Sequence, residues 1–234
     1  MSEWWTYSLS DFLLFSPRTY YRLFELYNLA IWPAQIGALI LGVAIVALLL
    51  RGDSRQGRAV AAILAGCWLW VAWAYLLVRY DTINWAARYF ASGFVIEVLL
   101  LIWTGLIRNR LVFRPCADVV SKIGLGIFLF ALCIQPLIGP LIGRPWSQVE
   151  LFGIAPDPTA VGTLGVLLTA NRSVWTLLLV PLLWCAISGA TLLTMQSMEA
   201  FIMLGLAALV IILAVCQATS RPVRWGRGSP SVTD

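Results

Sequence analysis

Histidine is absent from the 234-residue sequence, and charged residues are scarce. Imidazole is the commonest protein ligand of zinc and haem iron, so a haem, copper or catalytic zinc centre is not expected. Charged residues make up 12% of the chain, about half of the ~25% that is typical of soluble domains. The chain therefore has too few charges to cover a water-facing surface. We expect neither a soluble domain nor a bound metal or cofactor.

Catalytic and nucleotide-binding motifs are also missing. The sequence contains no Walker A, GxSxG, HExxH or GxGxxG pattern. The five cysteines form no CxxC pair, and a thiol within an apolar run behaves as a small hydrophobe. A retinal protein needs a lysine in its last membrane span to form the Schiff base. Lys122, the only lysine, lies between two apolar runs, so this function is excluded. Because these motifs are missing, we do not expect an enzyme. The basic residues form no patch with stacking aromatics, so we do not expect nucleic-acid binding either.

Long hydrophobic runs are what the sequence has instead. Hydrophobic residues form 61% of the chain, and about 20 apolar residues in a helix cross the ~30 Å hydrocarbon layer. Runs of this kind predict membrane spans at about 29–50, 59–78, 83–107, 123–143, 174–194 and 200–217. The stretch 151–170 is long enough as well, but Pro156-Asp157-Pro158 interrupts it. It is either a broken fifth span or a short re-entrant helix, and the predicted fold is an all-α integral membrane protein with about seven transmembrane helices.

The N-terminal segment, residues 1–28, contains a predicted amphipathic helix. Ser16 followed by Pro17 is typical of a helix start. Beyond it, aromatic residues fall on one helical face and charged residues on the other. This pattern predicts a helix in the membrane interface that runs straight into the first span. The alternative is a helix packed on the loops of the bundle itself.

The basic residues predict an orientation for the polytopic domain (29–217) and for the basic tail (218–234). If 151–170 crosses the membrane, 11 of them fall on the side of the tail and 5 on the other side. Positive residues collect on the cytoplasmic side. The sequence therefore predicts an outside N-terminus and a cytoplasmic C-terminus, whereas a re-entrant 151–170 places the tail outside.

Glu97 is the strongest candidate for a functional residue. It lies near the middle of the third predicted span, with no charged residue within eight positions on either side. A carboxyl group inside a membrane is costly unless it is paired, protonated or hydrated. Helical spacing places Glu97 and Thr104 on one face, away from Arg88, so its partner is expected on another helix. Glu97 is interpreted as a proton or cation carrier, or else as a protonated carboxyl that hydrogen-bonds between helices for packing alone.

Four further polar residues are candidates for a transport path for protons or a solute. Gln135 lies beside Pro136, whose missing N–H frees a backbone carbonyl. Asp157 is suited to cap the helix that follows it, and a half-helix of this kind can also direct its dipole at a substrate. Ser188 and Thr191 lie on the more polar face of the sixth span, which is expected to face the bundle.

Three stretches resemble a bacterial family of uncharacterised multi-pass membrane proteins: WWTYSLSDFLLFSPRTYYRLFELYN, APDPTAVGTLG and PLLWCAISGATL. The resemblance covers essentially the whole chain. It implies the bacterial inner membrane as the location, and it implies no activity, cofactor or catalytic residue.

The residues themselves predict a small transporter for a proton-coupled or small polar solute. The alternative is a non-catalytic subunit of a larger membrane complex. The expected partners are the lipid bilayer and either identical copies of the chain or such a complex.

Overall fold

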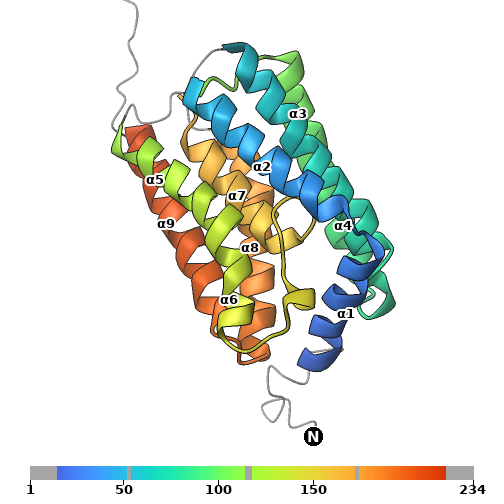
Figure 1. Ribbon diagram of the computed structural model, residues 1–234. Coiled ribbons are helices and arrows are strands. Elements are labelled where there is room, and N and C mark those ends of the chain that lie inside the picture. Colours follow the sequence, from blue (N-terminus) through green and yellow to red (C-terminus); the bar gives the residue numbers. More distant parts are fainter. Residues whose placement is uncertain (1–14, 52–53, 114–117, 172–173, 220–234) are drawn as a thin grey trace, which may run out of the picture.

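The computed structural model describes residues 15–51, 54–113, 118–171 and 174–219. Within these ranges the regular elements are all helices, and no strand is present beyond one isolated bridge between Phe113 and Ala170. The helices pack side by side into an elongated bundle (Figure 1). The all-α prediction is confirmed for this part of the chain. Residues 1–14 of the predicted N-terminal segment and 220–234 of the predicted tail lie outside the described residues.

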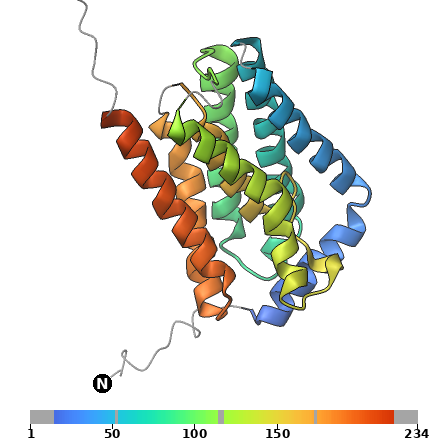
Figure 2. The same cartoon turned by 60° about the vertical axis from the view of Figure 1, so that its left-hand side comes forward.

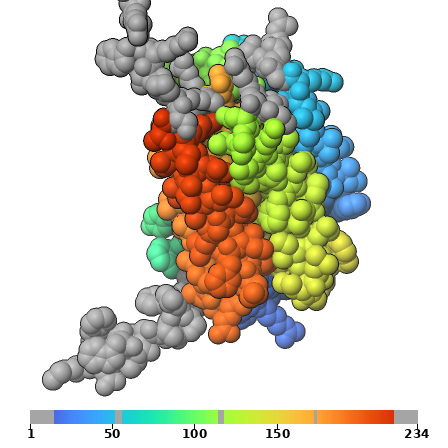
Figure 3. Space-filling view, turned by 90° about the vertical axis from the view of Figure 1, so that its left-hand side faces the viewer, coloured from blue at the N-terminus to red at the C-terminus, as the bar shows by residue number. Residues whose placement is uncertain are grey.

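Six helical rods in the described ranges are long and apolar enough to cross a membrane. They are Ala34–Arg51 (α2), Gln56–Thr82 (α3 to η4), Ala87–Ile107 (α4 and η5), Val119–Leu141 (α5 to α6), Trp175–Thr194 (α8) and Glu199–Thr219 (α9). Each rod corresponds to one of the predicted uninterrupted runs. Their outward faces carry large apolar side chains, as helices in contact with hydrocarbon do. Figure 3 shows α9 and the α5–α6 rod side by side on one face of the molecule.

Three of the rods change to a π-helix along their length. α3 (Ser54–Trp70) continues as η3 (Val71–Leu77), and α4 (Ala87–Leu101) continues as η5 (Ile102–Ile107). α5 (Val119–Leu129) reaches α6 (Gln135–Leu141) through η6 (Phe130–Ile134). Pro136 has no N–H to donate to the preceding turn, which accounts for the break in the α-helical pattern there. Turns of π-helix are rare and occur frequently at functional sites.

α1 (Pro17–Ala30) forms where it was predicted, with the Ser16 hydroxyl accepting a capping hydrogen bond. Its aromatic face is buried against the protein, where the Phe24 ring stacks on Tyr75 of η3 at 4.8 Å. The helix ends before Pro33, which cannot continue it, and α2 starts in a new direction (Figure 2). The predicted continuous run into the first span is therefore wrong. The alternative placed α1 on the loops of the bundle, and one such contact is present: the side-chain amide of Asn28 donates to the carbonyl oxygen of Ser147 in the loop 142–155.

α7 (Pro156–Leu168) lies in the centre of the bundle (Figure 1). All 13 of its residues are buried, whereas each of the six rods exposes one side. Its closest approach is to α5, where a Cβ added to Gly165 would lie 2.6 Å from the backbone nitrogen of Phe128 and 2.7 Å from the carbonyl oxygen of Gly124. The absence of a side chain at Gly165 lets the two backbones meet.

The segment that contains α7 connects the two ends of the bundle. Before α7, the loop 142–155 lies at the α1 end, where the side-chain amide of Asn28 donates to the carbonyl oxygen of Ser147 at 2.9 Å. After α7, Ala170 pairs with Phe113, which follows η5 at the opposite end. The chain thus enters at one end of the bundle and leaves at the other. With 13 residues, α7 alone is too short to span a bilayer.

Candidate functional site

A small cavity lies where α7 begins, between α6, α8, α9 and the loop 142–155. Its volume is about 20 Å³, which is room for about one water molecule. Carboxyl, guanidinium and amide groups gather in its wall: Gln135, Arg144, Gln148, Glu150, Asp157 and Glu199. We call this site the acidic cavity, because three carboxyl groups face a single guanidinium there.

Asp157 joins α7 to α8 at the inner side of the acidic cavity. The indole N–H of Trp184 donates to Oδ1 at 2.8 Å, and the hydroxyl of Ser188 donates to Oδ2 at 2.7 Å. The predicted capping role of Asp157 is wrong, because Ala155 is the N-cap of α7 and both Asp157 oxygens are engaged by α8. Asp157 does lie in the first turn of α7, where the helix dipole favours negative charge. A buried charge needs hydrogen-bond donors in place of water, and both oxygens of Asp157 have one.

The sequence around Asp157 explains why a helix begins at this point. Pro156 and Pro158 lack N–H groups, which the first helical turn would leave unpaired in any case. The hydroxyl of Thr159 accepts a hydrogen bond from the backbone N–H of Gly153 at 2.9 Å and donates to a loop carbonyl at 2.6 Å. Gly153 has φ +84°, a conformation open to glycine. The incoming loop is thereby tied to the first turn of α7.

Arg144 and Glu199 form an ion pair at the outer side of the acidic cavity, with side chains 15% and 16% exposed. Tyr21 of α1 covers the pair, since its ring centroid lies 4.2 Å from the guanidinium carbon. Gly139 leaves room for the guanidinium, because a Cβ there would lie 2.9 Å from Arg144 Nη2. Nε and Nη1 of Arg144 are buried without an acceptor in the described part of the chain. Two donor nitrogens of Arg144 therefore have no acceptor among the described residues.

Glu150 is the cavity carboxyl that lies in the loop ahead of α7. Burial raises the pKa of Glu150 well above its usual range, and the nearby Asp157 and Glu199 raise it further, against a smaller lowering by Arg144. Glu150 therefore binds a proton more readily than an exposed glutamate. Among the residues that the structure describes, no three His, Cys, Asp or Glu side chains are arranged to hold a metal ion.

The structure brings together three of the six residues that the sequence singled out: Gln135, Asp157 and Ser188. The fourth, Thr191, donates its hydroxyl to a backbone carbonyl of its own helix at 2.9 Å. The remaining two are buried on the α4–η5 rod, away from this cavity: Glu97 and Thr104.

The sequence did not single out Arg144, Glu150 or Glu199 as site residues. Each lies in a loop or at the first turn of a helix, where a charged side chain is ordinarily solvated. Loops have no periodicity from which a buried face could be inferred. The one available signal was the presence of Arg144 and Glu150 shortly before the interrupted stretch 151–170.

Glu97 is the second buried carboxyl of the bundle, and its predicted inward orientation is confirmed by its full burial. The predicted hydrogen bond to another helix is absent, since neither carboxyl oxygen has a partner among the described residues. The expected partners are engaged elsewhere: Ser188 binds Asp157, and the amide of Gln135 donates to Met203 Sδ at 3.8 Å. A site of this kind accommodates the neutral acid and not the carboxylate.

The fold and the cavity define a helical bundle of six apolar rods around a buried half-helix with an acidic start. A model of a family of unknown function (DUF6064) matches residues 18–223, so the chain belongs to that family. This confirms the resemblance to an uncharacterised family, and it implies no activity. No curated protein and no solved structure matches the chain.

Proposed function

We propose that this protein is a membrane carrier that moves protons, together with a small polar solute, through the acidic cavity. The observation that carries the proposal is the position of Asp157, a buried carboxyl at the start of a helix that begins inside the bundle. Transporters commonly use half-helices of this kind to direct the positive end of the dipole at a bound group. Ionisable groups inside a membrane bundle typically mark proton or ion pathways.

In the proposed topology the six rods cross the bilayer, and 151–170 crosses as a broken fifth span. The α1 end then faces outside, and the basic tail faces the cytoplasm of a bacterium. Thiol labelling tests this topology in a background without the five native cysteines. A cysteine introduced at Ser54 should react only from the cytoplasmic side, and one introduced at Ser147 only from outside. Labelling of both from the same side would overturn the topology.

Protons are favoured as the carried ion by the balance of charge in the cavity. Its three carboxyls and one guanidinium leave an excess of negative charge when all are ionised, and proton uptake relieves it. The raised pKa of Glu150 supports uptake from the outer solution. The Arg144–Glu199 pair, covered by Tyr21, lies between the cavity and the α1 end, where its opening would admit a ligand.

A small polar solute is favoured as the co-substrate by the unsatisfied groups of the cavity wall. Gln135 Oε1 is a buried acceptor without a donor, and Arg144 Nε and Nη1 are donors without an acceptor, among the residues described. Such groups cost free energy until a ligand or water pairs with them. A solute that both donates and accepts hydrogen bonds is complementary to them.

Proton entry into proteoliposomes tests the proposed carrier. Vesicles contain the dye pyranine and potassium, and valinomycin makes their interior negative. We expect the protein to acidify the lumen faster than protein-free vesicles do when a mixture of neutral amino acids, sugars and polyols is outside. Asp157→Asn should abolish the difference. Asp81→Asn is the matched control, because it removes a carboxyl that pairs with Arg88 outside the cavity, and it should act as the wild type does.

Two results would contradict the proposal. One is proton entry by the wild type that does not exceed entry into protein-free vesicles. The other is equal entry with Asp157→Asn and with the wild type.

A further inference from the structure

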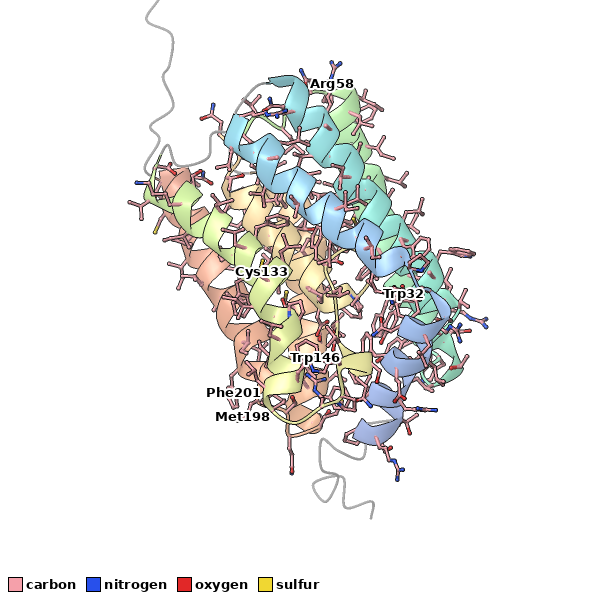
Figure 4. All side chains as sticks on the ribbon, viewed as in Figure 1. Trp32, Arg58, Cys133, Trp146, Met198 and Phe201 are labelled. Atoms are coloured by element: carbon pink, nitrogen blue, oxygen red, sulfur yellow. The ribbon has the colours of Figure 1, made fainter. Side chains whose placement is uncertain are left out.

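A second and larger hollow opens on the side of the bundle, between the α1–α2 turn and α6. Its volume is about 500 Å³, within the range of small-molecule sites. Five leucines from α1, α2, the η6–α6 segment and the loop line it: Leu29, Leu39, Leu132, Leu137 and Leu151. We call this hollow the lateral groove. Figure 4 shows its lining residues Trp32, Cys133 and Trp146 on the face of the bundle that is turned to the viewer.

One end of the lateral groove is polar and held in shape by hydrogen bonds. Asn28 donates from its side chain to the carbonyl oxygen of Ser147 at 2.9 Å, and Gln35 donates to the carbonyl oxygen of Asn28 at 2.7 Å. These bonds connect α1, α2 and the loop 142–155. Trp32 and Trp146 also belong to this end, and both rings are about two-thirds exposed, at 67% and 70%. Exposed indole rings anchor at the level of the lipid headgroups.

The other end of the lateral groove is apolar and lies further along the rods. Leu39 lies on α2, seven residues after Trp32 of the α1–α2 turn, and Leu132 precedes α6 on the facing rod. The groove thus changes from polar to apolar in the direction in which a bilayer changes from headgroup to hydrocarbon.

We propose that the lateral groove binds one hydrocarbon chain of a membrane lipid, with the polar part of the lipid beside Trp32 and Trp146. The occupant follows from the position of the groove, which is continuous with the apolar outer faces of α2 and the α5–α6 rod. In the membrane these faces meet hydrocarbon. A lipid chain restores the dispersion contacts that an empty groove would lack. The inference rests on the proposed membrane topology and does not depend on proton transport.

A bound lipid would also contact the wall of the acidic cavity. Pro136 and Val149 line both the lateral groove and the acidic cavity. A chain in the groove therefore packs on one side of a shared wall whose other side faces the charged groups. Occupancy of the groove holds this wall in place.

Photo-crosslinking with a lipid probe tests the inference. The full chain is placed in vesicles of phosphatidylethanolamine and phosphatidylglycerol that contain a small fraction of phosphatidylglycerol with a diazirine on one acyl chain. After irradiation, we expect crosslinked peptides to be enriched several-fold at residues 29–39 and 132–151 over the outer face of α9. Leu137→Trp fills the groove and should remove this enrichment. Leu129→Trp is the matched control on the same rod, with 39% exposure against 41% for Leu137, and should preserve it.

The possible results distinguish failure of the lipid-binding inference from misfolding of the variant and from failure of the proposed carrier. Uniform crosslinking of all outer faces, unchanged by Leu137→Trp, would show boundary lipid only and overturn the inference. If Leu137→Trp does not fold, as judged by its melting transition, Leu39→Trp fills the groove from the opposite wall and must give the same loss. Enriched crosslinking beside unaltered proton entry in Asp157→Asn would support the groove and contradict the proposed carrier.

Discussion

Asp157 and Glu97 are buried to nearly the same degree, with 4% and 0% of each residue exposed, in opposite surroundings. Asp157 begins a half-helix and has a donor on each oxygen, from Trp184 and Ser188. Glu97 lies within a long rod, and neither of its oxygens has a partner in the described chain. Burial alone therefore does not show whether a carboxyl group can carry a charge. The first site compensates for a charge, and the second accommodates only a neutral acid.

Replacing Asp157 should have the largest effect on stability. Asp157→Leu leaves the Trp184 N–H and the Ser188 hydroxyl without an acceptor. We expect the free energy of unfolding in detergent to fall by about 2–3 kcal/mol, at the upper end for two interhelical hydrogen bonds in a membrane protein. Asp81→Leu, which removes the exposed pair with Arg88, should cost less than about 1 kcal/mol. Equal losses would mean that Asp157 contributes no more than a surface ion pair does.

Replacing Glu97 should have a smaller effect of opposite sign. Glu97→Leu removes two buried oxygens that have no partner among the described residues, so the free energy of unfolding should rise by about 1 kcal/mol. Glu97→Gln keeps an unsatisfied polar group and should not stabilise the protein. Chemical unfolding of both variants measures the difference. A loss of stability in Glu97→Leu would reveal the interhelical hydrogen bond that the sequence predicts and the structure lacks.

The third effect is expected at Glu150, and it should depend on pH. Because its pKa is raised in the folded protein, the folded state binds the proton more tightly than the unfolded state does. Stability therefore falls as pH rises above the unfolded pKa of about 4.3 toward the raised value. Glu150→Gln removes this loss. Its melting temperature should match that of the wild type near pH 4 and exceed it increasingly toward neutral pH, and parallel curves would contradict the expectation.

The six rods and the interruption of the fifth run were predictable from sequence. A long apolar run identifies a candidate span without knowledge of its neighbours, and two prolines around Asp157 mark a helix start. The complete burial of α7 was not predictable, because an apolar helix has the same composition whether protein or lipid surrounds it. Contacts such as Gly165 on Phe128 decide that question, and they depend on the tertiary structure.

The candidate site was predictable only in pieces. Asp157 and Ser188 were singled out separately, because each is a polar residue in an apolar segment. Their hydrogen bond joins residues 31 positions apart, and no local pattern contains it. The same limit applies to α1, whose aromatic face was correctly predicted. An apolar face suits both lipid and protein, so the sequence could not tell that Phe24 packs on Tyr75.

In the proposed carrier, the carboxyls of the acidic cavity exchange protons with the solution and Glu97 does not. Infrared difference spectroscopy between acidic and neutral pH tests this claim directly in membranes, because protonated carboxyls have a distinct C=O stretching band. We expect a pH-dependent band that is weakened in Asp157→Asn and in Glu150→Gln and unchanged in Glu97→Gln, since the Glu97 band should be present at both pH values. A pH-dependent band that disappears in Glu97→Gln and persists at full strength in Asp157→Asn would contradict the claim.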